Sequence, residues 1–158
     1  MSFDITRSFS FITKTESVGE ILALNDVTQN YGISLSASDA AAIVENRDKS
    51  LANTGRIEFG KSISEKIIRV FCSSPYVSGA TFADTVSELT EVFYYYKSET
   101  CEKLSDDELI QLMKDEFDGR CEGSVELLAS KALYEYTQKL KGFEDDENDD
   151  AEGDDIYV

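Results

Sequence analysis

The chain has 158 residues, the usual size of one domain, and 41% of them are hydrophobic, which suffices for a packed core. Its 32 acidic residues outnumber 15 basic ones, and this net charge of -17 argues against direct binding to nucleic acid or to anionic membranes. We expect a cytoplasmic protein, because there is no membrane-spanning run, no signal peptide in the first twelve residues and no disulfide framework among three widely spaced cysteines.

Residues 1–14 alternate in part between apolar and polar side chains, with four apolar residues at odd-numbered positions: Phe3, Ile5, Phe9 and Phe11. Alternation of this kind is typical of a short strand or of an arm laid on the core. A lone strand is not stable without a partner, and no partner is evident. We therefore predict an N-terminal arm over residues 1–14.

Two helices are predicted next. Apolar residues at helical spacing indicate a first helix from Thr15 to Tyr31, followed by Gly32 where a helix end favours a left-handed residue. Ser36 and Asp39 have the spacing of an N-terminal capping box and predict the start of a second helix, which Gly55 would end.

Four further helices are predicted between residues 62 and 142. The third spans 62–73 and is ended by Pro75, the only proline. The fourth starts at Thr81, with Asp84 completing a capping pair. The fifth starts at Ser105, which is followed by three acidic residues as is typical of the first turn of a helix. The sixth begins near Ser124 and continues to residue 140.

The composition changes abruptly after the sixth helix. From Glu144 to Asp155 there are nine acids and no base or large apolar residue, so burial cannot offset the entropy of ordering. We predict a disordered acidic tail over 143–158. The fold class is therefore all-α: a compact bundle of about six helices in one domain, 15–142.

The sequence provides little for catalysis. It contains no histidine, no Cys-x-x-Cys pair and no phosphate-binding glycine loop, so we expect no catalytic residue, no cofactor and no metal site. The acids of Ser105-Asp-Asp-Glu108 fit a helix N-terminus, which favours negative charge, better than a metal site. Cys72 falls on an apolar helix face and is predicted to be a core residue, whereas Cys101 and Cys121 lie near helix ends and are expected to be partly exposed.

Two features could form an interaction surface. Four consecutive aromatic residues, Phe93 to Tyr96, cannot all lie on one helix face. Phe93 and Tyr96 fit the core stripe, which leaves Tyr94 and Tyr95 either packed on neighbouring helices or available to a partner. Arg47 falls on the apolar stripe of the second helix, where it could pair with an acid and tie helices together, or bind an anion.

Several segments resemble a family of short acidic bacterial proteins of unknown function, chiefly from Gram-positive anaerobes. They are Gly55-Arg-Ile-Glu-Phe-Gly60, Phe71-Cys-Ser-Ser-Pro-Tyr76, Phe93-Tyr-Tyr-Tyr-Lys-Ser-Glu99, Leu104-Ser-Asp-Asp-Glu-Leu-Ile110 and the stretch from Phe117 to Leu128. The resemblance covers residues 20–140. It implies a bacterial single-domain protein and carries no catalytic residue with it.

Three hypotheses for function follow. The first is a non-enzymatic protein that binds another protein, or itself, through an aromatic patch with Tyr94, Tyr95 and Arg47. The second is an acidic mimic that occupies a nucleic-acid-binding protein. The third is a metal-dependent enzyme in which Glu88 and Glu91 of one helix meet Asp115 and Glu116 of another inside the bundle. We favour the first.

Overall fold

The computed structural model describes the backbone of residues 5–58 and 62–142, with side chains from residue 14 onward in those ranges. The predicted acidic tail, 143–158, lies outside the described residues, as do residues 1–4.

The N-terminal region is helical where the sequence pattern predicted an arm. Helix α1 spans Ile5–Ala23, so the backbone of the predicted arm is helical from Ile5 onward. Apolar alternation does not exclude a helix, and this segment contains no proline and only one glycine, Gly19, that could weaken it. The helix therefore extends further toward the N-terminus than the apolar stripe alone indicated.

The single helix predicted from Thr15 to Tyr31 is interrupted at Leu24. After it come the short helix α2 (Asn25–Thr28) and the 3₁₀ turn η1 (Gln29–Tyr31). The Asn25 side chain donates to the Leu35 carbonyl at 3.0 Å and accepts from the Leu35 N–H at 2.7 Å. These two bonds fix the turn against the segment that leads to the next helix. Gly32 ends η1 in the left-handed region, with φ 75°.

Helix α3 (Ala37–Thr54) begins and ends as predicted. The Ser36 hydroxyl accepts from the Asp39 N–H at 3.0 Å, and the Asp39 carboxylate accepts from the Ser36 N–H at 2.9 Å. This reciprocal capping satisfies two donors that the first turn of a helix leaves unpaired. Gly55 ends the helix with φ 64°. Helix α4 (Ile63–Phe71) follows, capped by the Ser62 hydroxyl.

Helices α5 (Phe82–Glu99) and α6 (Asp106–Asp118) lie where the sequence placed them. The predicted capping pair of Thr81 with Asp84 is wrong, because the Thr81 side chain makes no capping bond and its hydroxyl lies 2.9 Å from that of Ser78 instead. At α6 the capping box is present, with the Ser105 hydroxyl accepting from the Glu108 N–H at 3.2 Å.

The last predicted helix is present but irregular. It comprises α7 (Val125–Leu127), a π-helical segment η2 (Leu128–Ala132) and a regular stretch over residues 133–142. We call this continuous unit the final helix. Its start matches the prediction, since the Ser124 hydroxyl accepts from the Leu127 N–H at 3.1 Å.

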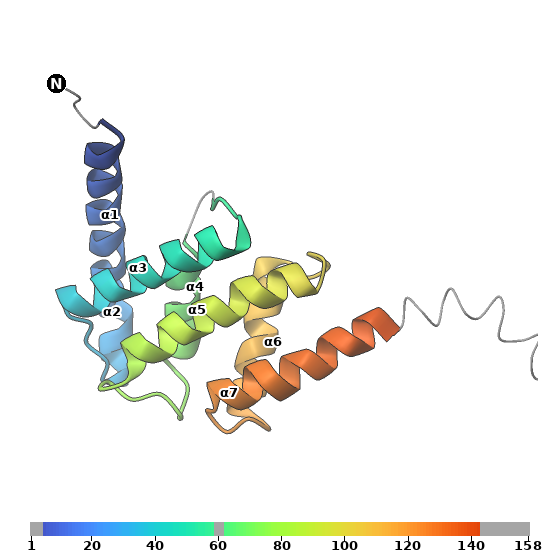
Figure 1. The fold of residues 1–158 in the computed structure, drawn as a ribbon. Coiled ribbons are helices and arrows are strands. Elements are labelled where there is room, and N and C mark those ends of the chain that lie inside the picture. Colours follow the sequence, from blue (N-terminus) through green and yellow to red (C-terminus); the bar gives the residue numbers. More distant parts are fainter. Residues whose placement is uncertain (1–4, 59–61, 143–158) are drawn as a thin grey trace, which may run out of the picture.

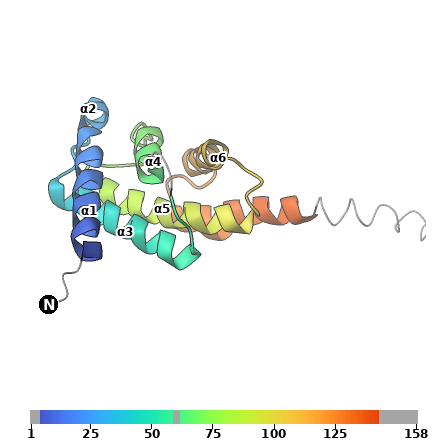
Figure 2. The same cartoon turned by 90° about the horizontal axis from the view of Figure 1, so that it is seen from above.

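The helices form two layers. Helices α3, α5 and the final helix lie in one layer, and α4 and α6 cross them in a second, as Figures 1 and 2 show. Helix α1 stands across α3 at one end of the molecule (Figure 1). Helix α5 contacts α3, α4, α6 and α7, so it is covered on several sides. The four largest fully buried side chains are aromatic: Phe71, Phe82, Phe93 and Phe117.

This arrangement confirms the predicted fold class, an all-α bundle of about six helices. Every regular element in the described part of the chain is a helix. Among the described residues, no helix combines the length and apolar character needed to cross a lipid bilayer.

Candidate functional site

Of the three residues that the sequence singled out as a possible interaction surface, the structure separates Tyr95 from Tyr94 and Arg47. Tyr95 is 55% exposed, as an interaction residue should be, whereas Tyr94 is only 4% exposed. The Arg47 side chain is 12% exposed. Of the two alternatives for Tyr94, the structure shows packing inside the molecule, because α5 has neighbours on more than one side.

Tyr94 belongs to a polar cluster built around Glu58. One oxygen of this carboxylate, Oε1, accepts from the Tyr94 hydroxyl at 2.6 Å and from the Ile63 N–H at 2.8 Å. The other oxygen, Oε2, lies 3.7 Å from Nε of Arg47. Burial raises the pKa of Tyr94 well above its usual range, and the nearby Glu58 raises it further. The phenol therefore remains protonated and acts as a donor to Glu58 at neutral pH.

Arg47 connects this cluster to its surroundings. Its Nη1 donates to the Ser62 hydroxyl at 3.2 Å, and its Nη2 forms an ion pair with Asp48 at 3.1 Å. Nε is buried and makes no hydrogen bond, since the distance to Glu58 is too long for one. The prediction that Arg47 pairs with an acid and ties helices together is confirmed. Two carboxylates already neutralise the guanidinium, so this geometry favours a structural role over anion binding.

A second set of ion pairs continues along the same side of α5. Lys97 lies 3.0 Å from Asp106 and donates to the Leu104 carbonyl at 2.5 Å. Arg56 lies 2.7 Å from Glu102. A small cavity of about 120 Å³ lies beside these pairs. Its lining includes two cations, Arg56 and Lys97, and two acids, Glu58 and Asp106, so the charges around it cancel. This side of α5 holds the connecting segments in place.

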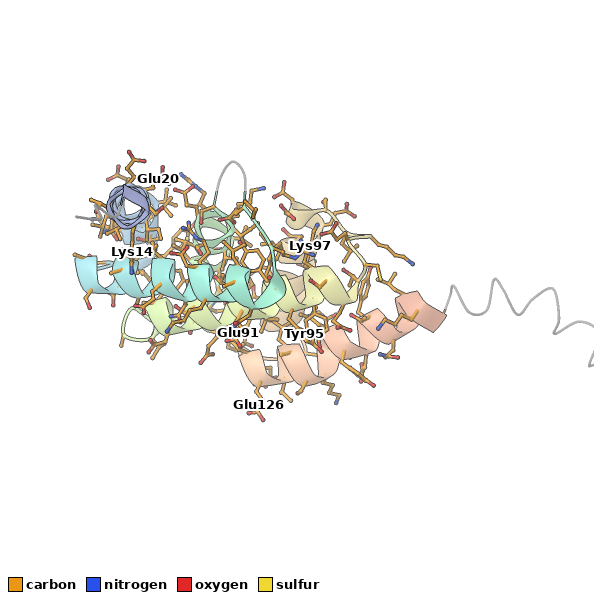
Figure 3. All side chains as sticks on the ribbon, turned by 45° about the horizontal axis from the view of Figure 1, so that its top comes forward. Lys14, Glu20, Glu91, Tyr95, Lys97 and Glu126 are labelled. Atoms are coloured by element: carbon orange, nitrogen blue, oxygen red, sulfur yellow. The ribbon has the colours of Figure 1, made fainter. Side chains whose placement is uncertain are left out.

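The other side of α5 carries an open apolar groove of about 350 Å³. We call it the Tyr95 groove. The C-terminal half of α3, helix α5 and the π-helical segment form its walls, with the residues Ser50, Asn53, Thr54, Glu91, Val92, Tyr95, Tyr96 and Ala129. Figure 3 shows Glu91 and Tyr95 on the side of α5 that faces the final helix, and Lys97 on another side.

The π-helical segment shapes one wall of this groove. Leu133 N–H donates to the Leu128 carbonyl, one residue further back than in an α-helix, so the Ala129 carbonyl loses its regular partner. The Tyr96 hydroxyl of α5 donates to that carbonyl instead. This bond joins α5 to the final helix at the floor of the groove.

Three tyrosines gather at the place where α5 meets the final helix. The rings of Tyr95 and Tyr96 are in edge-to-face contact, with centroids 5.0 Å apart. Burial raises the pKa of Tyr96, and Tyr95, Glu99 and Tyr134 add smaller effects in the same direction. Tyr95 and Tyr134 are both more than half exposed, so this corner presents aromatic surface to solvent.

The carboxylates of the enzyme hypothesis do not converge. Glu88 and Glu91 lie on the exposed face of α5, and Asp115 is exposed on α6, where it accepts from Gln111. Glu116 forms an ion pair with Arg120 of the turn that follows α6. No group of three or more potential metal ligands occurs among the residues that the structure describes.

The cysteines are placed partly as predicted. Cys72 is buried in the core, as expected, and Cys101 is exposed. Cys121, expected to be partly exposed near a helix end, is buried instead, because the turn after α6 folds back onto the core: the Cys121 N–H donates to the Glu116 carbonyl at 3.0 Å. Burial raises the pKa of both Cys72 and Cys121, which keeps them as thiols.

Two parts of this site escaped sequence reasoning. The acceptor Glu58 lies between the second and third predicted helices, where no site residue was predicted, although an arginine on an apolar helix stripe requires an acid nearby. The contribution of Ser50, Asn53 and Thr54 to the groove depends on how α3 crosses α5, and a single sequence does not indicate that angle.

No curated protein and no solved structure matches the chain. A family model described as "Family of unknown function (DUF6323)" matches residues 20–146. This match covers most of the chain, including every helix that lines the Tyr95 groove, so the chain belongs to the DUF6323 family.

Proposed function

We propose that this chain is a non-enzymatic binding protein of the bacterial cytoplasm, which holds a segment of another protein in the Tyr95 groove. The observation that carries the proposal is an apolar groove with a large aromatic side chain, Tyr95, left 55% exposed at its edge. Aromatic residues dominate the energetics of protein interfaces, and Tyr is among the commonest hot-spot residues.

The exposed area of Tyr95 is large enough to contribute substantially to binding. A Tyr side chain buries ~150–250 Å² when fully covered, so covering the exposed half of Tyr95 would remove ~100 Å² from water. At ~25 cal/mol per Å² this contributes ~2–3 kcal/mol, which reaches the magnitude that marks a binding hot spot. The neighbouring Val92 and Ala129 supply further apolar contact.

A different protein is a better partner than a second copy of the chain. A net charge of -17 on each copy opposes close approach of two identical molecules. A symmetric dimer through the groove would also bring Glu91 of one copy near the acids of the other.

Site-specific photocrosslinking tests this proposal. A photoreactive phenylalanine analogue is incorporated in place of Tyr95 in one version of the chain and in place of Tyr31 in another. Tyr31 is the matched control, because it is 54% exposed but lies on η1, away from the groove. We expect the photoreactive residue at position 95 to crosslink this chain to one discrete partner protein, and the residue at position 31 to crosslink it to none. Equal crosslinking from both positions, or none from position 95, would overturn the proposal.

A further inference from the structure

The charges around the Tyr95 groove identify the chemistry of its occupant. Helix α5 presents an exposed stripe of Asp84, Glu88, Glu91 and Tyr95, spaced by four, three and four residues. This spacing places them on one helix face. None of the three acids has an ion-pair partner within the described ranges, 14–58 and 62–142.

The basic residue of α5, Lys97, and two basic residues on the opposite side of α5 from the groove, Arg47 and Arg56, are paired with acids. Lys97 pairs with Asp106, and Arg56 pairs with Glu102, both away from the groove. Arg47 is held by Asp48 and Glu58. The groove side of α5 is therefore left with acids alone, next to an apolar floor.

We propose that the Tyr95 groove takes a cationic segment of a partner protein, in which an apolar anchor side chain is flanked by arginine. This inference rests on the proposed function and adds the chemistry of the partner. The apolar side chain would occupy the groove between Val92 and Ala129. The flanking arginines would pair with Glu88 and Glu91.

Arginine fits this face better than lysine. Glu91 and Tyr95 are one helical turn apart on the same face, so a planar guanidinium can lie over the exposed phenol ring and donate to the carboxylate at once. Lysine offers a point charge without that stacking surface.

The same face disfavours the other classes of occupant. Nucleic acids and anionic lipid surfaces would be repelled by Asp84, Glu88 and Glu91. A second copy would bring the same acids to the contact, and an acidic peptide would meet them unpaired.

Peptide selection against the full-length chain tests the inference. The probe is a phage-displayed library of random dodecapeptides, panned at physiological salt. We expect the selected peptides to combine an apolar residue with two or more arginines. The tightest peptide is then synthesised, and its affinity is measured by isothermal titration calorimetry with the wild type and three variants.

The variants separate groove binding from general attraction to an acidic protein. Glu88→Gln with Glu91→Gln removes one charge beside the groove and one that lines it, and Glu16→Gln with Glu20→Gln removes two exposed charges on α1. Figure 3 shows Glu20 apart from Glu91. Tyr95→Ala removes the aromatic edge. Circular dichroism melting confirms that each variant is folded.

The groove variant should bind the peptide about fivefold more weakly, since exposed ion pairs contribute modestly, and its affinity should depend less on salt. The α1 variant should stay within about twofold of the wild type, and Tyr95→Ala should lose about tenfold or more. Equal losses in the two charge variants would show attraction by net charge alone and overturn the inference.

The outcomes also distinguish this inference from the proposed function. Selection of neutral or acidic peptides whose binding depends on Tyr95 would contradict the cationic partner and leave the groove as the binding site. Peptides that bind Tyr95→Ala as tightly as the wild type would contradict both.

Discussion

Tyr94 and Tyr95 are adjacent in α5 and chemically identical, yet they occupy opposite environments. Tyr94 is buried and donates to Glu58, and Tyr95 is exposed at the edge of an apolar groove. Successive residues of an α-helix point about 100° apart, so one step along the chain moves a side chain from one face to another. One face of α5 stabilises the fold, and the other is the face that we propose binds a partner.

The largest expected effect comes from removing the carboxylate at the centre of the buried face. Glu58→Ala leaves Tyr94 without its acceptor and Arg47 without one of its acids. The two side chains of this ion pair are only 12% and 14% exposed, and loss of one member together with the acceptor of Tyr94 should lower the free energy of unfolding by about 3 kcal/mol. Urea denaturation measures it. An unfolding midpoint equal to the wild type would contradict the structural role of this face.

A matched pair of hydroxyl deletions sharpens the comparison. Tyr94→Phe removes a hydrogen bond to a carboxylate and should lower the free energy of unfolding by about 2 kcal/mol. Tyr95→Phe removes a hydroxyl that makes no hydrogen bond with the described part of the chain, and it should change the free energy of unfolding by less than about 0.5 kcal/mol. Both are measured under the same denaturant conditions. Similar changes in the free energy of unfolding for the two variants would contradict the difference between the Tyr94 face and the Tyr95 face of α5.

Tyr96→Phe tests the floor of the groove. This change leaves the Ala129 carbonyl of the π-helical segment without the Tyr96 hydroxyl. We expect a loss of about 1 kcal/mol in the free energy of unfolding, together with faster amide exchange in the final helix. Hydrogen exchange followed by mass spectrometry detects the local effect. Unchanged exchange over residues 125–142 would contradict the proposed link between α5 and the final helix.

The smallest effect is a dependence on alkaline pH. The pKa of Tyr94 is raised in the folded state, so its contribution to stability is complete below the unfolded pKa of about 10 and is lost as pH rises toward the folded pKa. The wild type should therefore lose more stability between pH 9 and 11 than Tyr94→Phe does. Urea denaturation across that range measures the difference. Parallel pH profiles would show that Tyr94 is not buried as described.

The predictable parts of the fold are those set by local chemistry. Ser36 with Asp39 and Ser105 with Glu108 mark helix starts because the capping bonds involve residues three positions apart. Phe93 and Tyr96 were assigned to the core because their spacing matches the apolar stripe of α5.

The features that sequence patterns left open or placed wrongly depend on contacts between distant segments. A stripe analysis assumes one buried face, and Tyr94 is buried because a second face of α5 is covered through Glu58, 36 residues away in sequence. The break at Leu24 depends on Asn25 bonding to Leu35, and the groove depends on the crossing of α3, α5 and the final helix. Periodicity alone contains none of these.

The central claim is that the Tyr95 face binds a partner and the Tyr94 face does not. The most direct test is calorimetric titration of the protein captured by crosslinking at position 95 into the wild type, Tyr95→Ala and Tyr31→Ala. This account predicts an affinity loss of about 30-fold for Tyr95→Ala, corresponding to ~2 kcal/mol, and a change of less than about twofold for Tyr31→Ala. Wild-type affinity in Tyr95→Ala would contradict it.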